Sequence, residues 1–193
     1  MRFFIAIDIS PSIKKEILRL TAILKKGDPD VKWVNENKIH ITLKFLGNIE
    51  EKNIKPISEA IREICRKHNT FNVTFSELGA FPRIAKPKVL WLGIDKGSDF
   101  LTNLAKDIDS GLVNIGFKSE EREFKPHLTI GRVRSLRNIP ALTGSIKKTN
   151  FLLKETTEVN QVVLFQSILD PKGAIHNPIS HFTLKQLYPV TNS

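Results

Sequence analysis

The chain has 193 residues, 40% of them hydrophobic, which is enough to bury one substantial core. Its single cysteine, Cys65, excludes an internal disulfide and argues against a cysteine-based zinc site. Thirty Lys and Arg against twenty Asp and Glu give a net charge of +10, which favours an acidic partner such as nucleic acid. No apolar run approaches the roughly 18 residues of a membrane span, so we expect no membrane contact, and the lone cysteine suits a reducing cytoplasm.

The first half of the chain alternates between strand and helix patterns. An apolar run at 3–9 predicts a strand, and Ser10-Pro11 behind it is a typical helix start. Apolar residues then recur at helical spacing up to Leu24. The pattern further along predicts an extended piece at 31–34, a strand at 39–46, a helix at 54–64, a strand at 71–78, a loop at 81–87 and a strand at 88–94.

The second half repeats much of this order. The pattern predicts a helix at 100–112, an extended segment at 127–133, a short helix as one interpretation of 138–148, and strands at 151–153, 159–169 and 179–188. No low-complexity tract or long linker separates the halves. We therefore expect a single domain over 1–193 with an α+β fold, built as two similar lobes of antiparallel sheet and flanking helices.

One short motif occurs at corresponding places in the two halves. His40–Leu43 and His127–Ile130 both read His, aliphatic, Thr, aliphatic, and both lie in a predicted strand. Since side chains alternate along a strand, the His and Thr of each motif share one face while the aliphatic residues anchor the other. A third match, His181–Leu184, falls in the last predicted strand, and we interpret His181 as a coincidental or packing histidine.

The paired motifs suit the opening of a cyclic phosphodiester. That reaction needs water deprotonated on one side of phosphorus and the leaving oxygen protonated on the other, and imidazole does either near neutral pH. His40 and His127 would form this proton-transfer pair, while the hydroxyls of Thr42 and Thr129 would bind the phosphate oxygens. No metal is required, and neither histidine has a carboxylate or cysteine in metal-binding spacing.

The motifs also carry a family resemblance over nearly the whole chain. The relevant segments are Arg2–Ile7, Trp33, His40–Gly47, Phe81–Arg83, Val89–Gly93 and Phe124–Arg132. Together they resemble the 2H phosphoesterase superfamily, and within it the RNA 2′,3′-cyclic phosphodiesterases once named 2′-5′ RNA ligases. The resemblance implies a bilobal fold with both motifs in a central cleft, and hydrolysis of 2′,3′-cyclic phosphate ends of RNA or nucleotides to 2′-phosphates without a cofactor. It also implies that His40 protonates the leaving 3′ oxygen and His127 activates water.

Three further residues are possible substrate contacts. Lys44 shares the predicted face of His40 and would add positive potential there. Phe45 fits either a buried core position or a platform for a nucleobase. Arg132 lies just past the second motif, where strict alternation would turn it away from His127, so both orientations remain open. The family often has an aromatic residue near the position of His176, which puts stacking at that position in doubt.

Two other functions remain open at this stage. The first is an RNA ligase that joins a cyclic-phosphate end to a 5′-hydroxyl through a 2′-5′ bond, because the same groups act on the same phosphorus. The second is a basic RNA-binding module without catalysis, in which the histidines serve packing. Nothing in the sequence indicates an obligate interface, so we expect a monomer.

Overall fold

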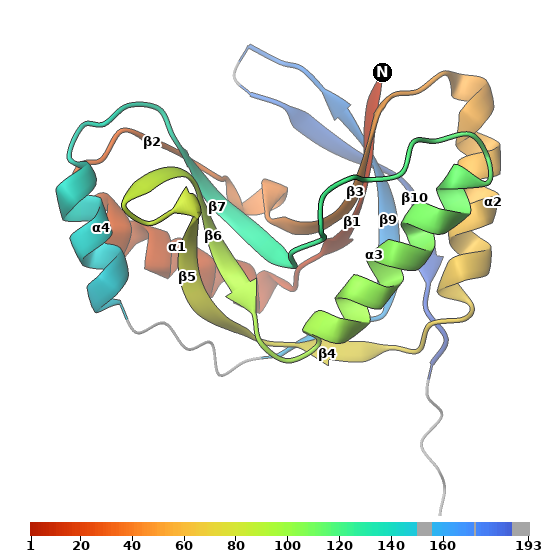
Figure 1. Ribbon diagram of the computed structural model, residues 1–193, viewed down its shortest axis with the longest axis horizontal. Helices are drawn as coiled ribbons and strands as arrows, with labels where there is room; N and C mark the ends of the chain where they lie inside the picture. The colour runs from red at the N-terminus through yellow and green to blue at the C-terminus, as the bar shows by residue number, and fades with distance from the viewer. Residues whose placement is uncertain (150–155, 172, 187–193) are drawn as a thin grey trace, which may run out of the picture.

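The computed structural model describes residues 1–149, 156–171 and 173–186, and it contains two four-stranded antiparallel sheets (Figure 1). Sheet A has the order β10-β9-β1-β3, and sheet B has the order β2-β7-β6-β5. Two short strands, β4 and β8, pair with each other outside these sheets. The strands are β1 (Arg2–Asp8), β2 (Val31–Trp33), β3 (His40–Asn48), β4 (Phe71–Val73), β5 (Phe75–Arg83), β6 (Lys86–Ile94), β7 (His127–Val133), β8 (Thr157–Val159), β9 (Gln161–Ile168) and β10 (Ile175–Thr183).

Among the described residues, four helices flank the sheets, two beside each (Figure 1). They are α1 (Pro11–Lys25), α2 (Ile54–Cys65), α3 (Ser98–Val113) and α4 (Ile139–Lys148), with single 3-10 turns η1 (Glu36–Lys38) and η2 (Glu51–Asn53). Helix α2 packs on β9, β10 and α3, and α3 contacts β3, while α1 packs on α4. Antiparallel sheets with helices beside them confirm the α+β class.

Each sheet combines strands from distant parts of the sequence. In sheet A, β1 pairs with β3 on one side and with β9 on the other. The first motif lies on β3 and the second on β7, so the two His-x-Thr strands belong to different sheets. The fold thus separates the motifs by sheet while keeping β3 and β7 in contact with each other.

Most predicted elements are present, and the exceptions have clear causes. The strand predicted at 71–78 is two strands with different partners, because β4 pairs with β8 and β5 with β6. The loop predicted at 81–87 is wrong, since β5 and β6 continue as a hairpin in which Pro82 lies opposite Pro87. Proline is tolerated there because the pair lies at the end of the ladder. Helix α4 settles 138–148 as helical, and the strand predicted at 151–153 lies outside the described residues.

The apolar faces of sheets and helices meet in one buried cluster. On β1, the side of Phe3, Ile5 and Ile7 joins this cluster, whereas Phe4 is buried on the opposite face. Helix α2 contributes Ile57 and Ile61 at helical spacing, as predicted from the sequence. The core therefore lies on one side of β1, and Phe4 on the opposite side is buried by contacts outside this cluster.

Gly97 provides a test of the packing at the start of α3. Its φ of +84° favours glycine, and an added Cβ would clash with the Asn72 carbonyl oxygen. Gly116 has φ +95° but open space around it, so it is a matched control. We expect Gly116→Ala to lower the free energy of unfolding by about 1 kcal/mol, and Gly97→Ala by about 1–3 kcal/mol more because of the clash. Urea denaturation of both variants measures the difference, and equal losses would contradict the packing described here.

Candidate active site

An extra residue in β3 decides which side chains share the face of His40. Thr42 and Lys44 pair with consecutive residues of β1, so Leu43 is an unpaired extra residue, a β-bulge. Side-chain alternation is reversed beyond the bulge. Lys44 therefore turns to the side covered by α3, and Phe45 comes to the face of His40 and Thr42.

Strand β7 has the same irregularity at the equivalent place. Thr129 and Gly131 pair with consecutive residues of β6, which leaves Ile130 as the extra residue. The partner of Arg132 on β6 lies on the same side as the partners of Thr129 and His127. Arg132 consequently shares the face of His127 and Thr129. The bulge falls on the final aliphatic residue of each motif.

His40 lies in a pocket of about 240 Å³ on one face of sheet A. Its ring centroid is 4.9 Å from that of Phe4 and 5.4 Å from that of His176, whose ring meets it edge-on. Phe165 also lines the pocket and stacks on Phe4 at 5.2 Å. The side chains with polar or charged groups in the lining are Asp8, Lys14, Asn37, His40 and His176. The imidazole thus has aromatic rings around it, and polar or charged side chains make up much of the remaining lining.

This environment keeps His40 uncharged at neutral pH. Burial is the main cause that lowers its pKa from 6.5 to about 4, and the positive charge of a protonated His176 adds to it. A hydrogen bond with the Lys38 backbone and the negative charge of Asp8 act in the opposite direction but do not outweigh burial. Burial, and after it the charge of Lys38, also lowers the pKa of His176. His40 therefore rests as the neutral imidazole in the free protein.

His127 is held by two contacts that fix its ring. Its Nδ1 lies 2.7 Å from the carbonyl oxygen of Lys125, and Phe81 meets the ring edge-on at 5.1 Å. Because a carbonyl only accepts, Nδ1 carries the proton and Nε2 is the atom left to exchange one. His40 likewise bonds to the backbone of Lys38. Each motif histidine therefore contacts the backbone of a lysine two residues earlier in the chain.

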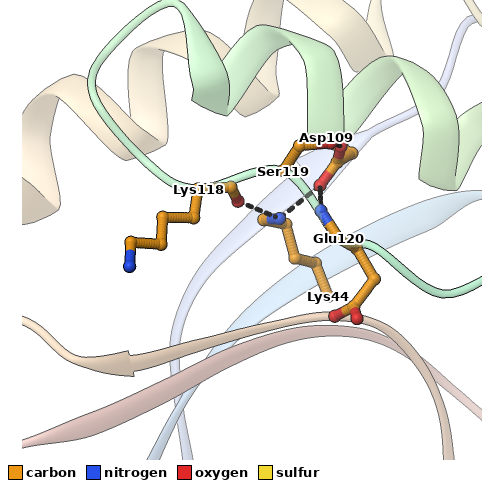
Figure 2. Close-up of polar contacts among 5 residues, drawn as sticks. All are labelled: Lys44, Asp109, Lys118, Ser119 and Glu120. Atoms are coloured by element: carbon orange, nitrogen blue, oxygen red, sulfur yellow. Dashed lines mark hydrogen bonds and ion pairs between the residues drawn. The ribbon is translucent and has the colours of Figure 1, made fainter.

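The structure corrects the placement expected for Lys44. Its side chain is buried on the helix side of sheet A, and its ammonium pairs with Asp109 of α3 and donates to the Lys118 carbonyl (Figure 2). The expectation that Lys44 shares the face of His40 is wrong, because the bulge at Leu43 reverses the alternation that the prediction assumed.

Three other side chains also differ from, or decide between, the sequence-based interpretations. Phe45 is 68% exposed, so it is not a core residue. Arg132 is exposed and takes the orientation toward the His127 face that strict alternation argued against. His181 is exposed on β10, so of the two interpretations the packing role is wrong and the coincidental match is the one that remains.

The sequence analysis missed Asp8, Lys14 and Phe165 of the pocket, and it named His176 only through the family resemblance. Asp8 lies directly opposite His40 in the register of β1 and β3, and Lys14 donates to its carboxylate at 2.8 Å. Predicting that strand pair would have found Asp8. Phe165 and His176 come from β9 and β10, and no local pattern links those strands to the first motif. Their place depends on the pairing of β1 with β9.

Within the described parts of the chain, no group of three His, Cys, Asp or Glu side chains is arranged to hold a metal ion. None of the helices that the structure describes has the length and apolar character needed to cross a bilayer.

Comparison with protein families identifies the family to which the chain belongs. The model of the LigT-like phosphoesterases matches the chain twice, over residues 7–91 and 92–176. Each match contains one His-x-Thr strand. The chain belongs to the LigT-like phosphoesterase family. The resemblance drawn from the sequence motifs is thereby confirmed.

Relatives of this LigT-like phosphoesterase carry a consistent name. A protein of Thermotoga maritima is 38% identical over 91% of this chain and 91% of its own. One of Methanocaldococcus jannaschii is 36% identical over 94% of this chain and all of its own. One of Methanothermobacter thermautotrophicus is 32% identical over 95% of this chain and 99% of its own. All three are named RNA 2′,3′-cyclic phosphodiesterase.

Solved structures share the fold at lower identity. A Thermus thermophilus protein superposes with a TM-score of 0.82 at 20% identity, covering 97% of this chain and all of its own. Escherichia coli LigT without ligand gives 0.77 at 24% identity, over 96% of this chain and 98% of its own. The same protein complexed with 3′-AMP gives 0.78 at 23% identity with the same coverage. These likenesses support the arrangement of sheets and helices.

The depressed pKa of His40 makes stability depend on pH in a defined window. An unfolded chain binds a proton at His40 below about pH 6.5, whereas the folded protein binds it only near pH 4. The contribution of neutral His40 to the free energy of unfolding is therefore full above pH 6.5. It is lost as the pH falls from 6.5 to about 4. We expect this residue to account for a loss on the order of 3 kcal/mol across that window.

Urea denaturation at pH 7 and pH 4.5, for the wild type and His40→Gln, measures this contribution. The variant lacks the titrating ring, so its stability should fall less on acidification. An identical fall in both proteins would show that His40 titrates normally in the folded state.

Proposed function

We propose that this protein hydrolyses the 2′,3′-cyclic phosphate ends of RNA or nucleotides to 2′-phosphates by two-histidine acid–base catalysis. The observation that carries the proposal is the matched construction of the two motifs. Each lies at the start of a strand in its own sheet, has a bulge at its fourth residue, and has a histidine bonded to the backbone of a lysine two residues earlier. The names of the relatives support the same activity.

The reaction follows from what two positioned imidazoles do. Water attacks phosphorus, and one imidazole takes a proton from it as the new P–O bond forms. The bond from phosphorus to the 3′ oxygen breaks on the opposite side, and the second imidazole gives that oxygen a proton. The products are a 2′-phosphomonoester and a 3′-hydroxyl, with no change of oxidation state. Each positioned acid or base contributes roughly 10²–10⁴-fold.

Neighbouring groups on the same faces complete the proposed site. Thr42 lies two residues after His40 and Thr129 two after His127, so both hydroxyls point as their histidines do. We assign them to the non-bridging phosphate oxygens, where negative charge develops. Arg132 adds a guanidinium on the His127 side, and the exposed ring of Phe45 is placed to stack on a base of the substrate.

The order of acid and base meets one opposing observation. The family resemblance makes His40 the acid, yet the free protein holds His40 neutral, which suits a base. A bound phosphate resolves this, because its negative charge in an enclosed pocket favours the protonated imidazole. We therefore retain His40 as proton donor and His127 as proton acceptor, with the substrate charging His40.

The proposal also covers the RNA substrate, the domain organisation, the oligomeric state, the location and the cofactor requirement. The net charge of +10 suits an RNA substrate, and the Escherichia coli relative complexed with 3′-AMP shows a nucleotide bound to this fold. We propose one catalytic domain over 1–193 in which the two sheets form two lobes around the site. We further propose that it acts as a monomer in the cytoplasm and without a cofactor.

The chain offers an internal control for the catalytic pair. His181 has the same His-x-Thr context but lies beyond the two segments that the family model matches, 7–91 and 92–176. We expect His40→Asn and His127→Asn each to lower kcat on nucleoside 2′,3′-cyclic phosphates by roughly 10²–10⁴-fold, with His181→Asn close to wild type. Chromatography of the product identifies the 2′-phosphate. Full activity in both motif variants would exclude the assigned pair, and joined products without hydrolysis would favour the ligase.

The proposed roles also predict how phosphate changes His40. In an NMR titration of the imidazole, we expect inorganic phosphate or a 2′-nucleotide to raise the pKa of His40 from about 4 by at least one unit, because the bound anion stabilises the charged ring. Sodium chloride at matched ionic strength is the control. A pKa that stays near 4 with ligand bound would reverse the roles and make His40 the base.

A further inference from the structure

Five residues form a polar cluster on the side of sheet A that faces α3 (Figure 2). We name it the Lys44–Asp109 clasp, and its members are Lys44, Asp109, Lys118, Ser119 and Glu120. Lys44 donates to Asp109 and, at 3.0 Å, to the carbonyl oxygen of Lys118. The clasp therefore joins β3, which carries the first motif, to α3 and the segment behind it.

Asp109 uses both carboxylate oxygens to hold that segment. Its Oδ2 accepts from the Ser119 hydroxyl at 2.7 Å, and its Oδ1 accepts from the Glu120 backbone N–H at 3.1 Å as well as from Lys44. Burial acts to raise the pKa of Asp109, but these three donors and the charge of Lys44 together lower it. The carboxylate thus remains charged at neutral pH and keeps all of its donors.

The segment between α3 and β7 has little else to hold it. Residues 118–123 are all exposed, while Phe117 and Phe124 on either side pack against the core. Within the described residues, every hydrogen bond that 118–123 makes goes to Lys44 or Asp109. Phe117 and Phe124 anchor the two ends of the segment in the core, so these polar contacts determine the path of the chain between them.

This segment ends at the backbone group that orients the second histidine. Lys125 follows the exposed stretch by two residues, and its carbonyl accepts from Nδ1 of His127 at 2.7 Å. At the other end of the clasp, Lys44 lies four residues after His40 on one strand. The Lys44–Asp109 ion pair therefore connects β3, which carries His40, to the segment that leads to the Lys125 carbonyl bonded to His127.

We infer that the Lys44–Asp109 clasp is a positioning device that fixes the segment before His127 against β3 and so sets the two imidazoles relative to each other. The inference rests on the proposed function for its kinetic consequence but not for its structural one. Misplacement of a reacting group by about 1 Å costs on the order of 10²-fold in rate. Loss of the clasp should therefore lower kcat and leave substrate binding nearly unchanged.

The principal variant replaces the ion pair as a unit. Removing one partner would leave a buried charge unpaired and destabilise the fold, whereas exchanging both for apolar side chains is often tolerated. The double variant Lys44→Met with Asp109→Leu should therefore fold and lack the clasp. Ser119→Ala removes only one bond from an exposed residue, leaves the buried pair intact and serves as a milder second variant. The control is Glu63→Leu with Arg66→Met, which removes an exposed ion pair at the C-terminal end of α2.

Three readouts test the positioning role. We expect the double variant to lower kcat on cytidine 2′,3′-cyclic phosphate about 10- to 100-fold with KM within about threefold, and Ser119→Ala to lower kcat about 2- to 10-fold. Amide hydrogen exchange over 118–125 should accelerate in both variants. Imidazole ¹⁵N NMR should show a mixture of His127 tautomers in the double variant, in place of the single form with the proton on Nδ1. The control should match wild type in all three.

The outcomes separate the two proposals. If wild type fails to hydrolyse the cyclic phosphate, the proposed function is wrong, and exchange and the His127 tautomer still decide the positioning role. If the segment exchanges faster while His127 keeps its tautomer and kcat stays at the wild-type value, the clasp is only structural and the inference is overturned. Unchanged exchange in Ser119→Ala and in the double variant would overturn it as well.

Discussion

An extra residue inside each of the two His-x-Thr motifs is the constraint on which the site depends. A strand without bulges would keep Lys44 on the face of His40 and turn Arg132 away from His127. The bulges at Leu43 and Ile130 reverse both outcomes. The lysine is thereby free to pair inside the protein, and the arginine is free to face the second motif. Bulges occur often beside active sites because they re-aim side chains in this way.

The two histidines share a local construction but differ in their surroundings. His40 is enclosed by Phe4, Phe165 and His176, and this enclosure lowers its pKa to about 4. His127 has one aromatic neighbour, Phe81, and a firm bond to a carbonyl. Two groups of the same type are thus held in unequal environments, as the proposed division into acid and base requires.

Local patterns predicted the elements well where a single strand or helix carries its own signal. Strand β7 begins at His127 and ends at Val133, as the sequence indicated, and the repeat of its motif located both histidines. The predictions failed where a partner strand decides the structure. Apolar alternation runs unbroken through Phe71, Val73 and Phe75, so nothing local shows that the partner changes from β8 to β6. The bulges are likewise defined only against β1 and β6.

The pocket illustrates the same limit. His176 and Phe165 reach the first motif only because β9 and β10 extend sheet A beyond β1. A sequence without pairing information does not connect these residues to His40. The motifs therefore predicted the strand positions of His40 and His127, whereas the aromatic surroundings that lower the pKa of His40 were not predicted.

The place of β1 in sheet A has a consequence for how the protein assembles. Because β1 is hydrogen-bonded to β3 on one edge and to β9 on the other, its second edge stays unpaired until Gln161–Ile168 returns to it. Closing so long a loop slows folding, and an apolar strand with an open edge invites pairing with other chains. A fragment ending before Gln161 would lack one wall of the His40 pocket and expose that edge, so the far end of the sequence protects the strand from aggregation as well as completing the site.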